Sequence, residues 1–156
     1  MDEYERAVKI AAGYVSARMY TCKELEDKLL RRKFDRAVAE KVVSEYVAAG
    51  ILDDREYAKL YASEAIRISG KGMYRIKQEL FKKGVAGSII DEICEDCEND
   101  TYEALKEYVN MRGLFDNITS RKELEKLQAR LIRRGFSLSE IKKCIREYKI
   151  SFDNEI

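Results

Sequence analysis

The cysteine pair Cys94-x-x-Cys97 has a spacing that could support zinc binding or redox chemistry. A structural zinc site needs four ligands, and the sequence has no histidine and no second cysteine pair to supply them. Histidine is also the most frequent general acid or base near neutral pH, so its absence argues against catalysis. We therefore expect no enzyme activity, no metal and no cofactor, and we interpret the cysteines as small apolar residues of the core.

Two adjacent carboxylates, Asp53 and Asp54, could bind a metal or act in acid–base chemistry. No third carboxylate or histidine lies at a spacing that completes such a site. Asp53 comes three residues before Glu56, which is the pattern of a helix N-terminus, and Asp54 would lie near the positive end of that helix. A contact between Asp54 and a partner protein is the alternative.

The segment Gly70-Lys71-Gly72 combines flexible glycines with a cation. It lacks the spacing and the Lys-Ser/Thr pair of a nucleotide-binding phosphate loop. Glycines before a helix can still let backbone N–H groups approach a phosphate. Ordinary loop geometry and contact with an anion therefore both remain open.

Three basic clusters, Arg31-Arg32-Lys33, Lys82-Lys83 and Arg133-Arg134, follow related apolar segments. A single cation near a helix C-terminus satisfies the helix dipole, whereas each cluster supplies at least two. Stacked copies would align these charges in a stripe. Such a stripe suits a nucleic-acid backbone or an acidic protein filament.

The elements that carry these clusters form an internal repeat of 51 residues. The ranges 25–34, 76–85 and 127–136 align without gaps, and the correspondence continues into the next helix, where Val42, Ile93 and Cys144 are equivalent. Apolar residues spaced by three and four positions share one helical face. Three copies of one unit are therefore predicted, with domain boundaries at 1–49, 50–99 and 100–156.

Helix start and stop signals divide each copy into three helices. The predicted helices are 2–19, 22–32, 36–48, 54–69, 72–83, 87–98, 101–112, 121–134 and 138–150. Capping boxes begin at Thr21, Asp53, Asp100, Ser120 and Ser137, and Gly50, Gly84 and Gly135 mark helix ends. We predict an all-α fold of nine helices in three tandem three-helix, HTH-like repeats, elongated and curved because small units must stack to bury a core.

The net charge of +1 conceals a strong local pattern. Residues 70–90 carry +4, residues 91–120 carry −7 and residues 121–156 carry +4. Different surfaces could thus meet an acidic and a basic partner. No apolar run approaches the roughly 18 residues of a membrane span, and no targeting segment is evident. We expect a cytoplasmic monomer with no membrane partner.

The central copy closely resembles the signature of the RecX family. The matching residues are Gly50-Ile51-Leu52-Asp53-Asp54-Arg55-Glu56-Tyr57-Ala58 with Tyr61, then Gly70-Lys71-Gly72, Arg75-Ile76, Glu79-Leu80 and Lys83-Gly84-Val85. The first copy is similar through Arg18, Tyr20-Thr21, Glu24-Leu25 and Lys28-Leu29, and the third through 131–136. The resemblance covers nearly the whole chain.

The resemblance implies a regulator of the recombinase RecA, active in DNA repair, recombination and the SOS response. It implies binding to RecA within the groove of the RecA–DNA filament, with inhibition of ATP hydrolysis, strand exchange and co-protease activity. The sequence departs from the family pattern in carrying Lys33 where the other copies have Gly84 and Gly135. It also ends Asp153-Asn154-Glu155-Ile156 without a basic tail, so only weak direct contact with DNA phosphates is expected.

The residues expected to contact RecA or DNA are mainly the recurring cations. They are Arg31, Arg32, Lys33, Asp54, Lys71, Arg75, Lys82, Lys83, Arg130, Arg133 and Arg134. The alternative is an independent DNA-binding regulator, because three-helix units can resemble helix-turn-helix modules.

Overall fold

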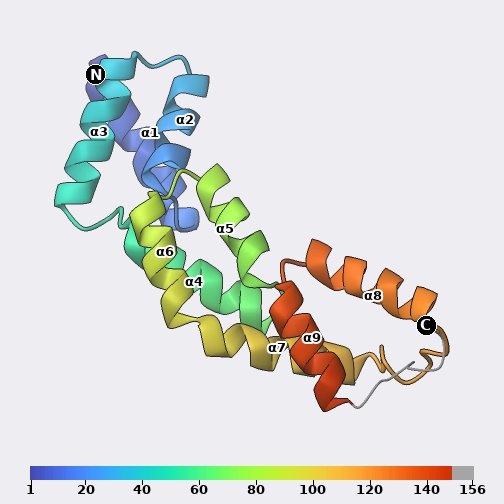
Figure 1. Ribbon diagram of the computed structural model, residues 1–156. Coiled ribbons are helices and arrows are strands. Elements are labelled where there is room, and N and C mark those ends of the chain that lie inside the picture. Colours follow the sequence, from blue (N-terminus) through green and yellow to red (C-terminus); the bar gives the residue numbers. More distant parts are fainter. Residues whose placement is uncertain (149–156) are drawn as a thin grey trace. The chain divides into compact units, whose positions relative to one another are not determined.

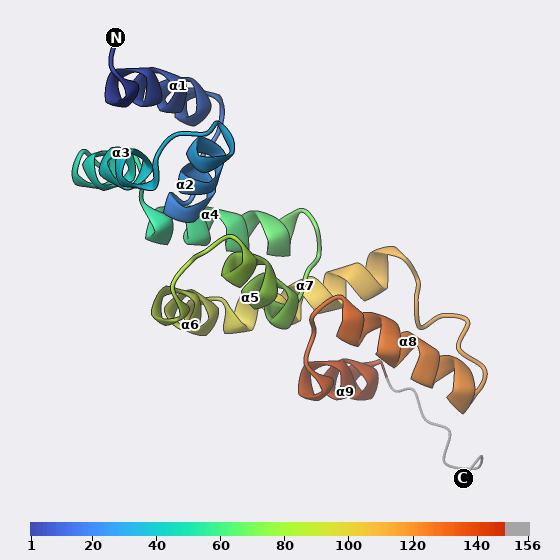
Figure 2. The same ribbon diagram turned by 90° about the horizontal axis from the view of Figure 1, so that it is seen from above.

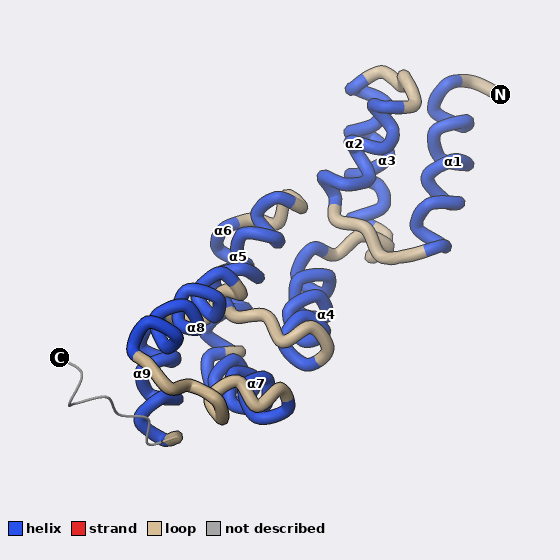
Figure 3. Tube along the Cα trace, turned by 90° about the vertical axis from the view of Figure 1, so that its right-hand side faces the viewer, coloured by secondary structure: helices blue, strands red, loops and turns tan. Residues whose placement is uncertain are grey.

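The computed structural model describes residues 1–148 and contains nine α-helices and no strand within them (Figures 1 and 3). The helices are α1 (Glu3–Ala17), α2 (Cys22–Arg31), α3 (Arg36–Ala48), α4 (Asp54–Arg67), α5 (Met73–Lys82), α6 (Gly87–Asp96), α7 (Glu98–Met111), α8 (Arg121–Arg133) and α9 (Leu138–Glu147). The predicted all-α class with nine helices is confirmed. The end of the last predicted helix, at 149 and 150, lies outside the described residues.

Side-chain caps begin four of these helices at residues that the sequence predicted, namely Thr21, Asp53, Ser120 and Ser137. Thr21 and Ser137 each form both halves of a capping box, with Glu24 and Glu140 respectively. Asp53 accepts hydrogen bonds from the two amides after Asp54, at 3.1 and 3.2 Å. These bonds satisfy N–H groups that have no partner inside the helix.

Two predicted caps differ from the structure. The box at Asp100 is wrong, because α7 begins at Glu98, directly after α6, and its N-cap Cys97 makes no side-chain cap bond. The chain is already helical at Asp100, since the amide of Thr101 bonds to the carbonyl of Cys97 at 3.1 Å. At Ser120 only half of the box forms, because the Glu123 carboxylate bonds to Thr119 instead.

The second helix of each copy ends in the same hydrogen-bonded turn. In the first copy the amide of Lys33 bonds to the carbonyl of Leu30, and the amide of Phe34 bonds to that of Leu29, at 3.0 and 3.3 Å. The same pair of bonds recurs at 84–85 and 135–136. This Schellman geometry needs positive φ at one residue, which is 69° at Lys33, 88° at Gly84 and 103° at Gly135.

The helices group into two compact units that differ from the sequence copies. The first unit comprises residues 1–60 with 80–90, and the second comprises 61–79 with the chain from Asp91 onward. The predicted boundaries of the three copies are a separate division and remain a prediction. No helix among the described residues has the length and apolarity to cross a membrane.

In the first unit α3 packs against both α1 and α2 (Figure 2). Its core is built from the apolar positions that the repeat predicts, on one face of each helix. The buried residues are Ala7, Ala11, Tyr20, Leu25, Leu29, Phe34, Ala39, Val42, Tyr46 and Leu52.

The second unit has an equivalent core, in which α9 packs against α7 and α8. Its buried residues are Leu105, Tyr108, Val109, Phe115, Leu127, Leu131, Phe136, Ile141, Cys144 and Ile145. The members Leu127, Leu131 and Phe136 correspond to Leu25, Leu29 and Phe34 of the first core. The 51-residue period is therefore a period of core positions.

Candidate interaction surfaces

The basic pair at the end of α5 has two different environments. The backbone carbonyl of Lys83 accepts a hydrogen bond of 2.6 Å from the hydroxyl of Thr21, and its Nζ lies 3.9 Å from Glu24 Oε2. Lys83 thus belongs to a junction inside the first unit. Lys82 is exposed and forms no ion pair with any described residue.

The pair at the end of α8 repeats this division in the second unit. Nε of Arg134 donates to the carbonyl of Gly70 at 3.2 Å, Nη2 donates to the carbonyl of Ser69, and the guanidinium lies 4.3 Å from the centre of the Tyr108 ring. The preceding Arg133 is exposed, with no ion pair to a described residue. Neighbouring helical residues point about 100° apart, so one cation faces the junction and the other faces solvent.

The first copy presents its whole cluster to solvent. Arg31, Arg32 and Lys33 are exposed, and none forms an ion pair within the part of the chain that the structure describes. Arg130 is also exposed, and its Nη2 donates to the Tyr108 hydroxyl at 3.3 Å. Of the predicted cations, six are exposed and form no ion pair among the described residues. Arg130 is one of them but bonds to Tyr108, and the other five are Arg31, Arg32, Lys33, Lys82 and Arg133.

The predicted site residues Lys71 and Arg75 converge on one carboxylate. Lys71 Nζ lies 3.0 Å from Glu79 Oε2, Arg75 Nε lies 3.1 Å from Oε1, and the Tyr61 hydroxyl donates to Oε2 as well. Burial alone would raise the pKa of the Glu79 carboxyl, but the three hydrogen bonds favour the charged form and hold its pKa below the usual value. This cluster positions the start of α5.

The amides of Lys71 and Gly72 are occupied by protein carbonyls. The amide of Lys71 bonds to the carbonyl of Ala65 at 3.0 Å, and that of Gly72 bonds to the carbonyl of Arg134 at 2.8 Å. A Cβ added to Gly72 would lie 2.2 Å from the backbone carbon of Gly135. The glycine is needed for this close approach, and anion binding by these two amides is therefore wrong.

Asp54 has a structural contact that the sequence did not reveal. Its Oδ1 accepts a hydrogen bond of 2.9 Å from the amide of Cys22, the first residue of α2. A contact between residues 32 positions apart leaves no local pattern in the sequence. The part-buried side chain supports α2, and its contact with a partner stays a prediction.

The four cysteines are free thiols, and Cys94 and Cys144 are buried. Burial raises the pKa of Cys22, Cys94 and Cys144 to about 11 and also raises that of Cys97. A thiol with a raised pKa is a poor nucleophile near neutral pH. Within the described residues no group of cysteine and carboxylate side chains could hold a metal ion.

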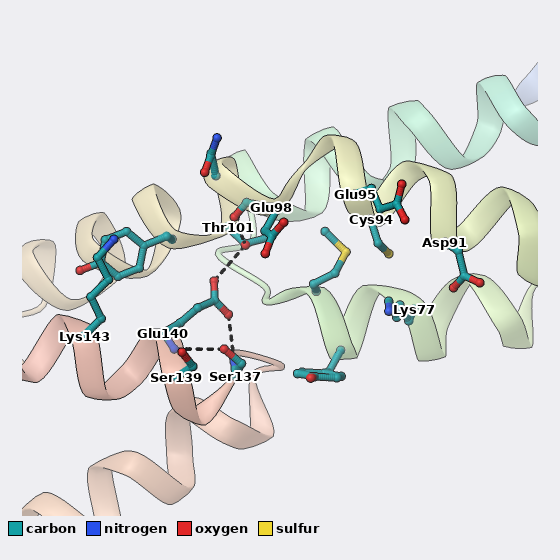
Figure 4. A pocket seen from close by; sticks show the side chains of 14 residues that line it. Lys77, Asp91, Cys94, Glu95, Glu98, Thr101, Ser137, Ser139, Glu140 and Lys143 are labelled. Carbon is teal, nitrogen blue, oxygen red and sulfur yellow. Dashed lines mark hydrogen bonds between the residues drawn. The ribbon is translucent and has the colours of Figure 1, made fainter.

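The second unit contains a hollow of about 580 Å³ between α5, α6, α7 and the start of α9 (Figure 4). Its charged lining is mixed, with Lys77, Lys143 and several acids. On one side Glu140 accepts from the hydroxyl of Thr101 at 3.0 Å and from the amide of Ser137 at 2.9 Å. Both carboxylate oxygens of Glu140 are engaged in holding the start of α9, so this residue is not available as a free acid or base.

Comparisons with known proteins converge on one family. Models of the first and second three-helix domains of RecX match residues 7–45 and 53–93 of the chain. The regulatory protein RecX of Chlorobium phaeobacteroides is 32% identical over 144 residues, which cover 90% of this chain and 92% of the relative. The regulatory protein RecX of Clostridium acetobutylicum is 34% identical over 154 residues, covering 94% and 70%.

Solved structures agree with the sequence relatives. The crystal structure of RecX from Lactobacillus salivarius superimposes with a TM-score of 0.83 at 25% identity, covering 95% of this chain and 97% of that one. Some relatives are longer: the chain spans only 58% of the regulatory protein RecX of Bacillus cereus strain B4264, at 30% identity.

Proposed function

Because the chain belongs to the RecX family of regulatory proteins, we propose that it binds the RecA recombinase and the RecA–DNA filament. Binding would mainly inhibit the ATPase, strand-exchange and co-protease activities of RecA. The relatives of this chain are regulatory proteins by name, which supports a regulatory role.

The observation that carries the proposal is the set of exposed cations at the ends of the second helices. Arg31, Lys82 and Arg133 occupy equivalent points of the repeat, and Arg32 lies beside the first of them. All four are exposed and form no ion pair with a described residue. Their neighbours Lys83 and Arg134 hold the fold. A position that carries a free charge in every copy suits an extended anionic surface, such as an acidic filament face or DNA phosphates bound within it.

Inhibition follows from a difference in affinity. A ligand shifts RecA between two states only by binding one of them more tightly. A chain that contacts neighbouring subunits of the filament would favour the state in which their spacing matches its own contacts. It would thereby oppose the rearrangements that ATP hydrolysis and strand exchange require.

The proposal is tested by reversing only the free cations. A variant with Arg31, Arg32, Lys82 and Arg133 changed to Glu should keep its fold and weaken inhibition of the DNA-dependent ATPase of RecA. We expect the half-inhibitory concentration to rise about tenfold or more, because each exposed charge contact contributes up to about 1 kcal/mol.

The matched control reverses the same number of exposed cations elsewhere. Lys122, Lys126, Lys142 and Arg146 are exposed and lie outside these helix ends. Changing them to Glu gives the same net charge and should leave inhibition nearly unchanged. Equal effects of the two variants would show that only net charge matters and would contradict the proposed role of the helix ends.

The second candidate is a regulator that binds DNA without RecA. The same exposed cations could then contact DNA phosphates directly. A gel-shift experiment with duplex DNA separates the two. Tight, sequence-selective binding in the absence of RecA would favour this second function, whereas weak and salt-sensitive binding fits the first.

A further inference from the structure

A second hollow, of about 310 Å³, lies within the second unit between the end of α4 and the first half of α7. Its floor is partly apolar, and one wall carries three carboxylates. The residues that matter here are Ile66, Cys97, Ala104, Asp100, Glu103 and Glu107. We call this hollow the α4–α7 groove.

The groove can be traced to a small residue at one repeat position. Cys97 stands where the first and third copies have Tyr46 and Tyr148. Tyr46 is 9% exposed within the first core and donates to the carbonyl of Val8 at 3.2 Å. Tyr148 packs edge-on against Phe115, with ring centres 5.0 Å apart. The central copy lacks such a ring and retains an opening beside Ile66 and Ala104.

The charge of the groove determines what can fill it. Asp100, Glu103 and Glu107 are spaced by three and four positions, so they share one face of α7. Glu103 is paired with Lys106 at 3.2 Å, whereas Asp100 and Glu107 form no ion pair with a described residue. The single cation that lines the groove is Arg67, on α4. The groove is thus negatively charged and apolar at its base.

We propose that the α4–α7 groove binds a basic segment of the protein partner, through an arginine or lysine side chain. The aliphatic stem would lie over Ile66 and Ala104, and the cationic head would meet Asp100 and Glu107. This inference rests on the proposed function, with RecA as the partner. A nucleic acid does not fit, because its phosphates would be repelled by the wall of carboxylates.

The first test fills the groove. Cys97→Tyr introduces the residue of the other two copies, whereas Cys97→Ser keeps the opening and serves as the control. The dissociation constant for RecA filaments on fluorescent single-stranded DNA is measured by anisotropy. We expect Cys97→Tyr to raise this dissociation constant about tenfold, which is the effect of losing one central contact of an interface. Cys97→Ser should leave the constant within about twofold of its original value.

The second test keeps the shape and changes the charge, so it does not depend on whether Cys97→Tyr folds. Asp100 and Glu107 are exposed, and changing both to Lys should weaken filament binding about tenfold or more. The control changes the exposed acids Glu5 and Glu40 of the first unit to Lys, which alters the net charge equally. This control should bind like the unchanged protein.

The outcomes separate the two proposals. If the unchanged protein neither binds nor inhibits RecA, the proposed function fails. If it does bind and the Asp100/Glu107 variant binds equally well, the groove proposal fails while the proposed function stands. A variant that loses affinity for free single-stranded DNA in the same proportion would assign the groove to nucleic acid and would overturn the inference.

Discussion

The hydroxyl of Thr21 donates a hydrogen bond of 2.6 Å to the carbonyl oxygen of Lys83, 62 positions further along the chain. The equivalent bond in the second unit runs from the amide of Gly72 to the carbonyl of Arg134, at 2.8 Å. In both places the C-terminal carbonyls of one second helix meet the N-terminal donors of the second helix one repeat earlier. Opposite ends of two helix dipoles therefore face each other.

Replacing Thr21 with Val should destabilise the protein. The buried hydroxyl accepts from the amide of Glu24 and donates to Lys83, so Thr21→Val removes a cap and leaves a carbonyl without its donor. We expect the free energy of unfolding to fall by about 2–4 kcal/mol, measured by urea denaturation. Thr21→Ser keeps both bonds and should lose much less. A loss in Thr21→Val no larger than that in Thr21→Ser would contradict the stabilising role of the two hydroxyl bonds.

Replacing the buried Gly72 with Ala should strongly destabilise the protein. The added Cβ would lie 2.2 Å from a backbone carbon, which no side-chain rotation relieves. We expect a loss of roughly 3 kcal/mol, because the two helix ends must separate. The matched control is Gly13→Ala in α1, where nothing lies within 4 Å of the new Cβ. It should stabilise the protein by about 0.5–1 kcal/mol.

Replacing Lys33 with Gly should stabilise the protein. Lys33 is exposed and holds φ of 69°, a region that strains a residue with a Cβ. After the greater entropy of glycine in the unfolded chain is subtracted, we expect a gain of about 1 kcal/mol in a thermal or urea melt. Lys33→Ala removes the charge but keeps the Cβ and should show no such gain. A gain with Ala would attribute the effect to charge.

The stability of the chain should fall in acid partly through Glu79. Its folded pKa lies below the unfolded value of about 4.5, so its contribution is complete above that pH and is lost as the pH falls through the folded pKa. Glu79→Gln should lower stability at pH 7 and flatten its decline below about pH 4.5. Chemical denaturation at several pH values measures both effects. Parallel pH curves for the two proteins would contradict this role.

The repeat allowed much of the fold to be predicted, because core positions, start signals and glycines recur in each copy. The cap at Asp100 was mispredicted, since nothing local to that residue reveals that α6 and α7 follow each other with almost no break. The basic pairs were located at helix ends, as the structure has them. Which member of each pair is free depends on contacts with Thr21, Ser69 and Gly70, more than 60 positions away.

The α4–α7 groove could be predicted only in part, because the sequence reveals the residue concerned but not its effect on packing. The alignment of Cys97 with Tyr46 and Tyr148 was visible in the sequence and suggested only a core substitution. A smaller residue can be followed by collapse of its neighbours or by an opening, and the sequence does not distinguish these results. The structure shows the opening beside Ile66 and Ala104.

The division of α5 between the two compact units has a consequence for how this protein can be shortened. Residues 73–79 of α5 belong to the second unit and residues 80–82 to the first. A chain cut after residue 99 would leave the amides of Gly72 and Tyr74 without the carbonyls of Arg134 and Gly135. The copies therefore cannot be removed independently of one another. Deleting the third copy would fray the N-terminal end of α5 in the second.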